Sequence, residues 1–417
     1  MATRIPWFAP VPLLELVRAL SRALDLVSPA VADHHLRVGY VAGRLGAAVG
    51  LPEPRRRDLM LAGLMHDVGA LSLQSRLDAL RFEADGKRHA EAGWRLLRMY
   101  PHLDRAGEFV RHHHDSWTEV QAAGVAPELN LLNLADRVDV LIRRGQPVAP
   151  QAEAVRRRIL RLSGRGFRPE YVEAFQDLAD REEFWAHCEA PAAHLDAAAP
   201  PLLLAERLSF DETLAFARLF ARIIDFRSAY TASHSSGVAE VAAWLGERAG
   251  MGPEARELLH MAGYLHDIGK LAVPAEILDK PGCLTGEEWE RMRRHAAYSG
   301  DVLGEVPGLE LVCRWAASHH ERLDGGGYPL GLRGPELDLG SRIVAAADVF
   351  TAITEDRPYR CGMPAEDARA VLAHVAEKGL DRAVVGLLLD GFDEVDELRR
   401  QAQVSVRDSF LTLGRAG

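Results

Sequence analysis

The 417-residue sequence has few cysteines, no excess of positive charge and no long apolar run. Its four cysteines lie far apart and form no CxxC pair, so we expect free thiols in a reducing cytosol. Lysine and arginine number 50 against 60 acidic residues, a net charge of −10 that argues against a duplex nucleic-acid partner. No apolar run approaches the ~20 residues of a membrane helix. The N-terminus also lacks the apolar stretch of a signal peptide, so the sequence predicts a cytoplasmic protein without membrane insertion.

Helical periodicity is the main pattern that the sequence does contain. His234, Val238, Val241 and Leu245 recur on one face of a helix, and the spacing repeats near residue 34. No strong alternating pattern predicts strands. The sequence therefore predicts an all-α fold.

One arrangement of histidines and aspartates occurs twice. The first copy comprises His34, His66, Asp67, His89, His113, His114 and Asp136, and the second His234, His266, Asp267, His295, His319, His320 and Asp348. His89 precedes the pair His113-His114 by 24 residues, and His295 precedes the pair His319-His320 by the same number. The repeat indicates a tandem duplication of helical bundles. The Ala/Pro stretch 197–201 is the best linker signal, so we expect domains at 1–196 and 202–417.

Five histidines and two aspartates in the second copy are too many ligands for one ion. Paired divalent ions roughly 3.5–4 Å apart are a recurrent device for hydrolysing phosphoesters. Nitrogen and oxygen ligands without thiolate suit iron, manganese or zinc. The adjacent His319 and His320 would diverge by about 100° on a helix and could serve two ions. The alternative is a set of inward-facing polar residues without metal.

Longer motifs in the second copy resemble those of a known family. The segments His266-Asp-Ile-Gly-Lys270 and His319-His-Glu-Arg-Leu-Asp-Gly-Gly-Gly-Tyr-Pro329 resemble the signatures of HD-GYP domains, a subgroup of the HD phosphohydrolases. The resemblance covers roughly residues 205 to 390, including the segments 347–352 and 356–360. It implies a binuclear metal site, most simply of iron or manganese, and a role in cyclic di-GMP signalling. The expected reaction is hydrolysis of cyclic di-GMP by a metal-bridging hydroxide to the linear dinucleotide pGpG, with further cleavage to GMP left open.

The resemblance also assigns roles to individual residues. One ion would be held by His234, His266, Asp267 and Asp348, and the other by His295, His319 and His320, with Asp267 bridging. Lys270 would act beside Asp267 in catalysis by binding a phosphate oxygen. Substrate would contact Arg322, Gly327, Tyr328, Pro329, Arg357 and Arg360. Each of these roles has an alternative without substrate. Lys270 could be a solvated lysine at a helix end, the glycine-rich loop an ordinary surface turn, and each arginine part of a structural salt bridge. Some relatives hold a third metal with a Glu where this sequence has Tyr230, so we expect two metals. Slower or incomplete turnover, stopping at the linear dinucleotide, is a hypothesis that follows from this.

The first copy keeps every ligand type but has Ala70 in place of the lysine and no Gly-Tyr-Pro loop. The alignment favours His34 and His113 over the neighbouring His35 and His112 as its metal-site residues. It is either a second metal-binding HD domain, with a different or lost activity, or a structural or regulatory half.

Two other functions compete with cyclic di-GMP hydrolysis. The same metals could act on another cyclic dinucleotide, such as cyclic GMP-AMP, or on a nucleoside phosphate. Alternatively, the protein is a non-catalytic signalling adaptor that contacts a partner such as a diguanylate cyclase. A homodimer is expected by analogy only.

Overall fold

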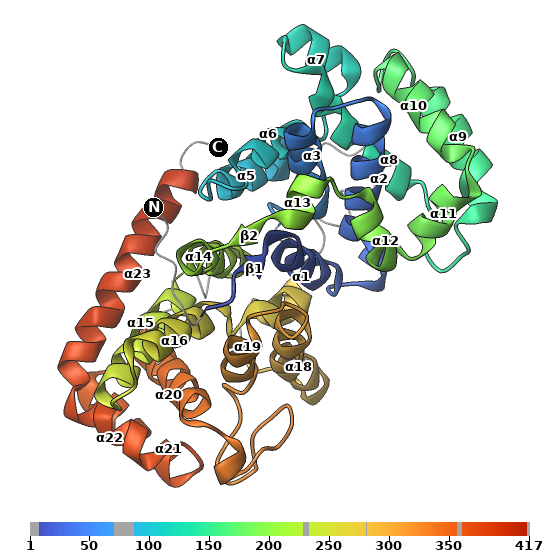
Figure 1. Cartoon of the computed structure of the whole chain (residues 1–417). Coiled ribbons are helices and arrows are strands. Elements are labelled where there is room, and N and C mark those ends of the chain that lie inside the picture. Colours follow the sequence, from blue (N-terminus) through green and yellow to red (C-terminus); the bar gives the residue numbers. More distant parts are fainter. Residues whose placement is uncertain (1–7, 71–86, 228–232, 281, 357–360, 415–417) are drawn as a thin grey trace. The chain divides into compact units, whose positions relative to one another are not determined.

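The computed structural model describes residues 8–70, 87–227, 233–280, 282–356 and 361–414 (Figure 1). The chain divides into two compact units, Pro12–Leu208 and Ser209–Gly417 together with Met1–Val11. The predicted linker lies at the end of helix α12 (Pro191–Ala198) and the start of α13 (Pro201–Ala205). The predicted domain limits, 1–196 and 202–417, stay a prediction.

The N-terminal unit is built from helices around the first copy of the repeat. Besides α12 and α13, they are α1 (Leu13–Asp25), α2 (His34–Ala48), α3 (Glu53–Met65), α5 (Lys87–Leu97), α6 (Asp104–Arg111), α7 (Trp117–Ala123), α8 (Asn130–Val140), α9 (Ala152–Leu160), α10 (Pro169–Ala179) and α11 (Glu182–Glu189). Short 3₁₀ turns lie at Pro29–Val31, Pro127–Leu129 and Ala149–Gln151.

The C-terminal unit is built from helices around the second copy of the repeat. Its helices are α14 (Phe210–Arg227), α15 (His234–Arg248), α16 (Pro253–Leu265), α17 (Ala275–Leu278), α18 (Gly286–Leu303), α19 (Glu310–Ala317), α20 (Leu339–Thr354), α21 (Ala365–Glu377), α22 (Arg382–Asp390) and α23 (Phe392–Gly414). Two 3₁₀ turns, η4 (Ile268–Ala272) and η5 (Gly334–Glu336), complete it.

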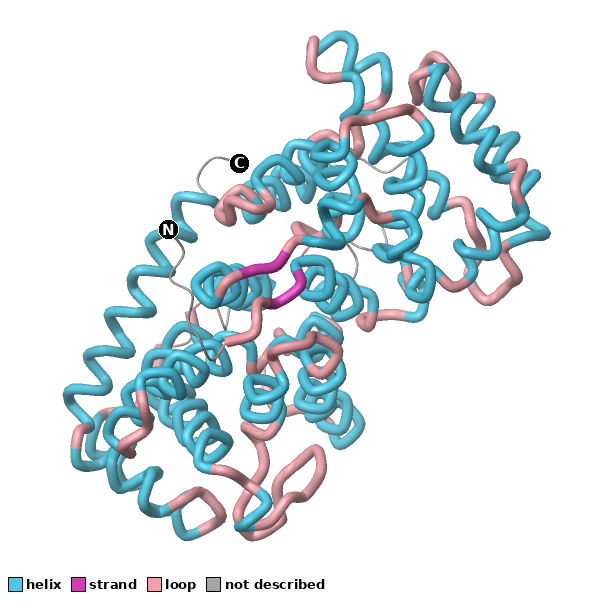
Figure 2. Tube along the Cα trace, viewed as in Figure 1, coloured by secondary structure: helices cyan, strands magenta, loops and turns pink. Residues whose placement is uncertain are grey.

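Strands are nearly absent from the described residues, as Figure 2 shows. Two-residue strands β1 (Val11–Pro12) and β2 (Arg207–Leu208) pair with each other. The prediction of an all-α fold is confirmed. Within the part of the chain that the structure describes, no helix is both long and apolar enough to cross a membrane.

Close packing of two helices places the first two histidines of each copy near each other. Helix α15 lies against α16, and a Cβ added at Gly263 would come within 2.4 Å of the Ala239 Cα. At the equivalent Gly63 of α3, an added Cβ would lie 2.9 Å from the Cα of Gly39 in α2. The predicted apolar stripe of α15, which comprises Val238, Val241 and Leu245, is fully buried.

A second glycine in each copy brings the third histidine close. A Cβ at Gly269, two residues after Asp267, would lie 2.0 Å from the backbone oxygen of His295, and one at Gly69 would lie 2.2 Å from that of His89. No side chain fits either position. The backbone that follows each His-Asp pair therefore touches the helix that carries the next histidine.

Candidate metal centres

The structure gathers all seven predicted residues of the second copy, which we call the C-terminal cluster. They lie at helix ends or on inward helix faces. His234 begins α15, His266 caps α16, Asp267 precedes η4, His295 lies in α18, His319 and His320 follow α19, and Asp348 lies in α20. Six of the seven are at most 9% exposed, and His320 is half-buried.

The cluster has two halves with Asp267 between them. In one half, His234 Nε2 lies 3.1 Å and His266 Nε2 3.9 Å from Asp348 Oδ1. The other half contains His295, His319 and His320. Asp267 Oδ2 lies 3.1 Å from His266 Nε2, and its Oδ1 lies 3.5 Å from His295 Nε2. One carboxylate thus presents an oxygen to each half.

Hydrogen bonds fix the tautomers of three of these histidines. The Nδ1 atoms of His266, His295 and His319 lie 2.6–2.7 Å from the backbone oxygens of Gly263, Met292 and Ala316. Each Nδ1 must donate a proton there, which leaves a lone pair on Nε2 of the neutral ring.

Those lone pairs have no proton donor to satisfy them. His295 Nε2 and His319 Nε2 face each other at 3.3 Å, and the buried atoms His266 Nε2 and Asp267 Oδ1 have no hydrogen-bond partner. Two facing lone pairs repel, and buried unpaired acceptors are costly. A cation among these atoms removes both penalties, so the residues fit a metal site.

Burial and neighbouring charges put His295 and Asp267 in states that bind cations, and they protonate His234. Burial lowers the pKa of His295 to about 3, which keeps its ring neutral. Burial alone would raise the pKa of Asp267, but His266 and Lys270 hold it well below its ordinary value. For His234, burial lowers the pKa, yet Glu355 and Asp348 more than offset this and raise it to about 10. A cation that binds beside His234 therefore displaces a proton.

The predicted divergence of His319 and His320 is wrong. Both lie in the turn after α19, where helical geometry no longer separates their side chains. Their ring centres are 4.0 Å apart, and both rings lie close to His295, at 5.3 and 5.0 Å. Both rings therefore lie beside His295, and His320 Nδ1 also lies 3.8 Å from Asp348 Oδ2 in the other half.

The predicted substrate loop lies directly against the cluster. The Tyr328 ring is 4.7 Å from that of His320, and its backbone N donates to the His320 carbonyl. A Cβ at Gly327 would lie 2.4 Å from the backbone N of Arg322, so the loop folds back tightly and holds Pro329 and the half-buried Arg322 beside it. The Tyr328–Pro329 peptide is cis.

Three residues that were not predicted shape this loop. Glu321, 3% exposed, accepts hydrogen bonds from the backbone N atoms of Leu330, Gly331 and Leu332. From α18, Arg293 lies over the Tyr328 ring at 5.0 Å and Trp289 packs edge-on at 6.4 Å. The Trp289 side chain is 47% exposed, so an aromatic surface remains open beside the loop.

Lys270 lies at the cluster but is not free. Its Nζ donates to Asp267 Oδ2, and its side chain is 19% exposed. The positive charge is therefore held at the carboxylate between the two halves.

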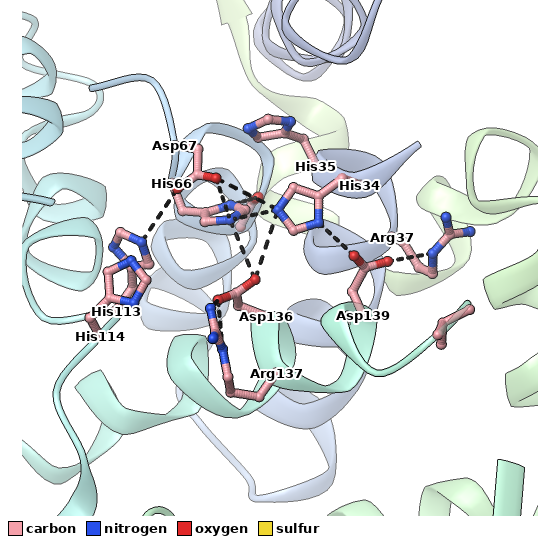
Figure 3. Close-up of polar contacts among 12 residues, drawn as sticks. His34, His35, Arg37, His66, Asp67, His113, His114, Asp136, Arg137 and Asp139 are labelled. Atoms are coloured by element: carbon pink, nitrogen blue, oxygen red, sulfur yellow. Dashed lines mark hydrogen bonds and ion pairs between the residues drawn. The ribbon is translucent and has the colours of Figure 1, made fainter. Parts of the chain in front are cut away.

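The first copy forms a similar N-terminal cluster from the seven predicted residues, all of which except His89 are labelled in Figure 3. His89 lies in α5, Asp136 in α8, and His113 and His114 follow α6. The neighbouring His35 pairs instead with Asp25, and His112 with Asp115. The alignment thus chose the two histidines that face the cluster.

The N-terminal cluster differs from its counterpart at Asp136. The buried Arg137 donates through Nε and Nη2 to Asp136 Oδ2, as Figure 3 shows. In the second copy the residue after Asp348 is Val349. A buried guanidinium therefore directly follows the last aspartate in the first copy and not in the second.

A buried carboxylate behind the first histidine was missed in both copies. His34 Nδ1 lies 2.5 Å from Asp139 Oδ2, and His234 Nδ1 lies 3.1 Å from Glu355 Oε2. Asp139 is three residues after Asp136, whereas Glu355 is seven after Asp348, so the repeat contains no aligned signal for them.

Three residues from the sequence predictions lie outside the described residues. They are the substrate candidates Arg357 and Arg360, and Tyr230 at the expected third-metal position. Their predicted roles stay predictions, as does metal binding by either cluster.

Comparison with known proteins finds the same domain family in both units. The HD domain family matches residues 31–141 and 218–384. A 3′3′-cGAMP-specific phosphodiesterase from Vibrio cholerae is 34% identical over 388 residues, which cover 89% of each chain. The cyclic di-GMP phosphodiesterase response regulator RpfG from Xanthomonas campestris is 36% identical over 180 residues, 43% of this chain and 48% of the relative. A crystal structure of a V. cholerae cyclic GMP-AMP specific phosphodiesterase shares the fold, with a TM-score of 0.64, 24% identity and coverage of 92% and 98% of the two chains.

Proposed function

Because this chain belongs to the HD phosphohydrolase family, with two HD domains in tandem, we propose that it hydrolyses a phosphodiester bond of a cyclic dinucleotide. The reaction is assigned to the C-terminal cluster. One observation carries this choice: only there do Lys270 and the loop around Tyr328 lie against the histidines. The first copy has Ala70 at the lysine position and no Gly-Tyr-Pro segment.

Two divalent ions, iron or manganese, would be held by the two halves of the C-terminal cluster, with Asp267 between them. Bound there, such ions lower the pKa of a water molecule and neutralise charge on phosphoryl oxygens. The buried histidines keep their Nε2 lone pairs available to hold such ions, because their Nδ1 protons are committed to backbone carbonyls. Glu355 orients His234 in the same way from Nδ1.

Lys270 and the loop would act on the substrate. Lys270 Nζ, held at Asp267, places a positive charge where negative charge develops on a non-bridging phosphoryl oxygen. Tyr328 and Trp289 offer aromatic faces for the bases. Gly327 and Pro329 shape the loop, and Arg322 would pair with a phosphate, as would Arg357 and Arg360.

The V. cholerae relative that is 34% identical and the V. cholerae crystal structure each match nearly the whole chain, and both are named for cyclic GMP-AMP, which supports 3′3′-cGAMP as the preferred substrate. Cyclic di-GMP, the substrate expected from the sequence, is the second candidate. It is favoured by the match of about two fifths of the chain to RpfG. In either case the first product is the linear dinucleotide, and pGpG is the one expected from cyclic di-GMP.

An adaptor without activity has no need of seven converging ligands and a lysine, so the enzyme is the better-supported function. Nothing in the structure or the comparisons bears on the predicted homodimer, the diguanylate cyclase partner or the cytoplasmic location. These stay predictions.

Turnover of 3′3′-cGAMP and cyclic di-GMP by the full chain, loaded anaerobically with Fe²⁺ or Mn²⁺, tests the proposal. Ion-exchange chromatography separates linear dinucleotides from mononucleotides. We expect turnover, its loss in His266→Ala/Asp267→Ala, and its retention in the matched N-terminal variant His66→Ala/Asp67→Ala. Full metal content without turnover of either substrate would contradict the proposal.

A further inference from the structure

We infer that the N-terminal cluster binds a single divalent metal ion through Asp67, His89, His113 and His114, and that Arg137 replaces a second ion. This site is separate from the C-terminal cluster and does not depend on the proposed phosphodiesterase activity. It also differs from a simple copy of the C-terminal cluster, because the two halves of the N-terminal cluster have different chemistry.

Four ligand atoms converge in one half, all within 4.8 Å of one another. His89 Nε2 lies 3.0 Å from Asp67 Oδ1, 3.2 Å from His113 Nε2 and 2.9 Å from His114 Nε2. Asp67 Oδ1 lies 3.5 Å from His113 Nε2. Ligand atoms ~2.1 Å from one ion are separated by roughly 3.0–3.4 Å in octahedral or tetrahedral geometry, so these four atoms have the spacing of a coordination sphere.

The same half contains acceptors without donors. His113 is fully buried, and its Nδ1 lies 2.6 Å from the Val110 carbonyl, so its Nε2 has a lone pair that points into the cluster. Asp67 is only 2% exposed, and although His89 Nε2 lies 3.0 Å from its Oδ1, no N–H is aligned for a hydrogen bond to that oxygen. A buried carboxylate oxygen in this state needs a cation. Three imidazoles and one carboxylate suit zinc, iron or manganese.

The other half already contains a cation. Arg137, 5% exposed, holds the Asp136 carboxylate through two nitrogens. A divalent ion bound by Asp136, His34 and His66 would lie beside this guanidinium in a buried site, where like charges repel strongly. In the C-terminal cluster Val349 replaces the arginine, so Asp348 has no guanidinium from the next residue, and the cation of that cluster, Lys270, bonds Asp267 instead. Arg137 therefore neutralises Asp136 and makes a second ion unfavourable.

Metal content of the full chain in the His266→Ala/Asp267→Ala background tests the inference without any activity assay. We expect one Mn²⁺ per chain by mass spectrometry and the six-line electron paramagnetic resonance signal of an isolated ion. No bound ion, or two ions with a coupled signal, would overturn it. If this background does not fold, as judged by circular dichroism, His234→Gln/His266→Gln/His319→Gln/His320→Gln replaces it, because that variant removes ligands from both halves of the C-terminal cluster.

Further substitutions in that background locate the ion. His89→Gln and His114→Gln should each release it, whereas Asp136→Asn should leave it bound. The reverse pattern contradicts the assignment. Arg137→Val, which copies the residue of the second cluster, should raise the content to two ions; a content that stays at one would refute the role of Arg137.

Discussion

Glu355 Oε2 lies 3.1 Å from His234 Nδ1, and both side chains are 3% exposed. The carboxylate fixes the ring so that Nε2 points toward Asp348. Glu355 is itself held by Gln403, whose Nε2 lies 3.0 Å from Oε2. Glu355, which does not face the proposed metal position, thus determines the orientation of His234, which does.

Replacing Glu355 with glutamine should lower metal affinity about 10- to 100-fold, because a neutral amide oxygen accepts the Nδ1 proton of His234 more weakly than the carboxylate does. Competition with a chelator measures this directly. Asp139→Asn removes the equivalent carboxylate behind His34 and is the matched control. It should leave the metal content unchanged, since no ion is expected beside His34. Equal chelator sensitivity of wild type and Glu355→Gln would contradict the prediction.

Lys270→Met should reduce kcat about 10²- to 10³-fold, the range for removing a donor to a developing oxyanion. Metal content should stay the same, because Nζ contacts Asp267 but supplies no ligand atom. Lys280→Met, which removes a lysine paired with Glu288 in the same unit, is the control and should keep full activity. Loss of metal in Lys270→Met would instead show that the lysine only maintains the cluster.

Trp289→Ala should raise KM about tenfold while kcat changes little, because stacking of one base contributes roughly 1–3 kcal/mol. Steady-state kinetics with 3′3′-cGAMP would separate the two constants. Trp289→Phe should restore most of the affinity, and Leu311→Ala, an exposed apolar residue of α19, should have no effect. An unchanged KM in Trp289→Ala would remove this residue from the substrate site.

Glu206 should make the N-terminal unit sensitive to acid. Its carboxylate accepts two hydrogen bonds of 2.6 Å from Arg57 and contacts His102. Burial raises its pKa, but the bonds from His102 and Arg57 more than offset this and lower it to about 2 from 4.5. The folded state therefore binds this proton less tightly than the unfolded state. The stabilisation is complete above pH 4.5 and is lost as the pH falls toward about 2.

Urea denaturation from pH 7 to pH 2.5 measures this contribution. Glu206→Gln should lower the free energy of unfolding by about 1–2 kcal/mol at pH 7, after allowance for partial exposure of the pair. The difference from wild type should shrink steadily below pH 4.5. Glu173→Gln, at an exposed position of α10, should leave the pH profile unchanged. A difference that stays constant down to pH 2.5 would contradict the assigned cause.

Helical periodicity and an internal repeat were enough to predict the fold and to find the residues that converge in both clusters. The repeat works because a histidine on an inward helix face has the same position in both copies. It also separated His34 from His35, which pairs with Asp25. The same logic could not find Glu355, because any residue one or two turns beyond Asp348 on α20 can approach His234.

The orientation of the histidine pair was mispredicted for a physical reason. A divergence of 100° holds only while the backbone is helical, and α19 ends at Ala317, before the pair. Arg137 went unnoticed because a charge next to an inward aspartate is common on helix surfaces. Its burial and its contact with Asp136 became apparent only in three dimensions.

The contact between Gly269 and the His295 backbone has a consequence for how such sites diverge. Since the main chains touch, the spacing of the donor atoms is inherited from helix packing and cannot be adjusted by exchanging one side chain. The same holds for Gly69 and His89. After duplication, the two copies were therefore free to differ in which charges occupy the inherited geometry, but hardly in the geometry itself.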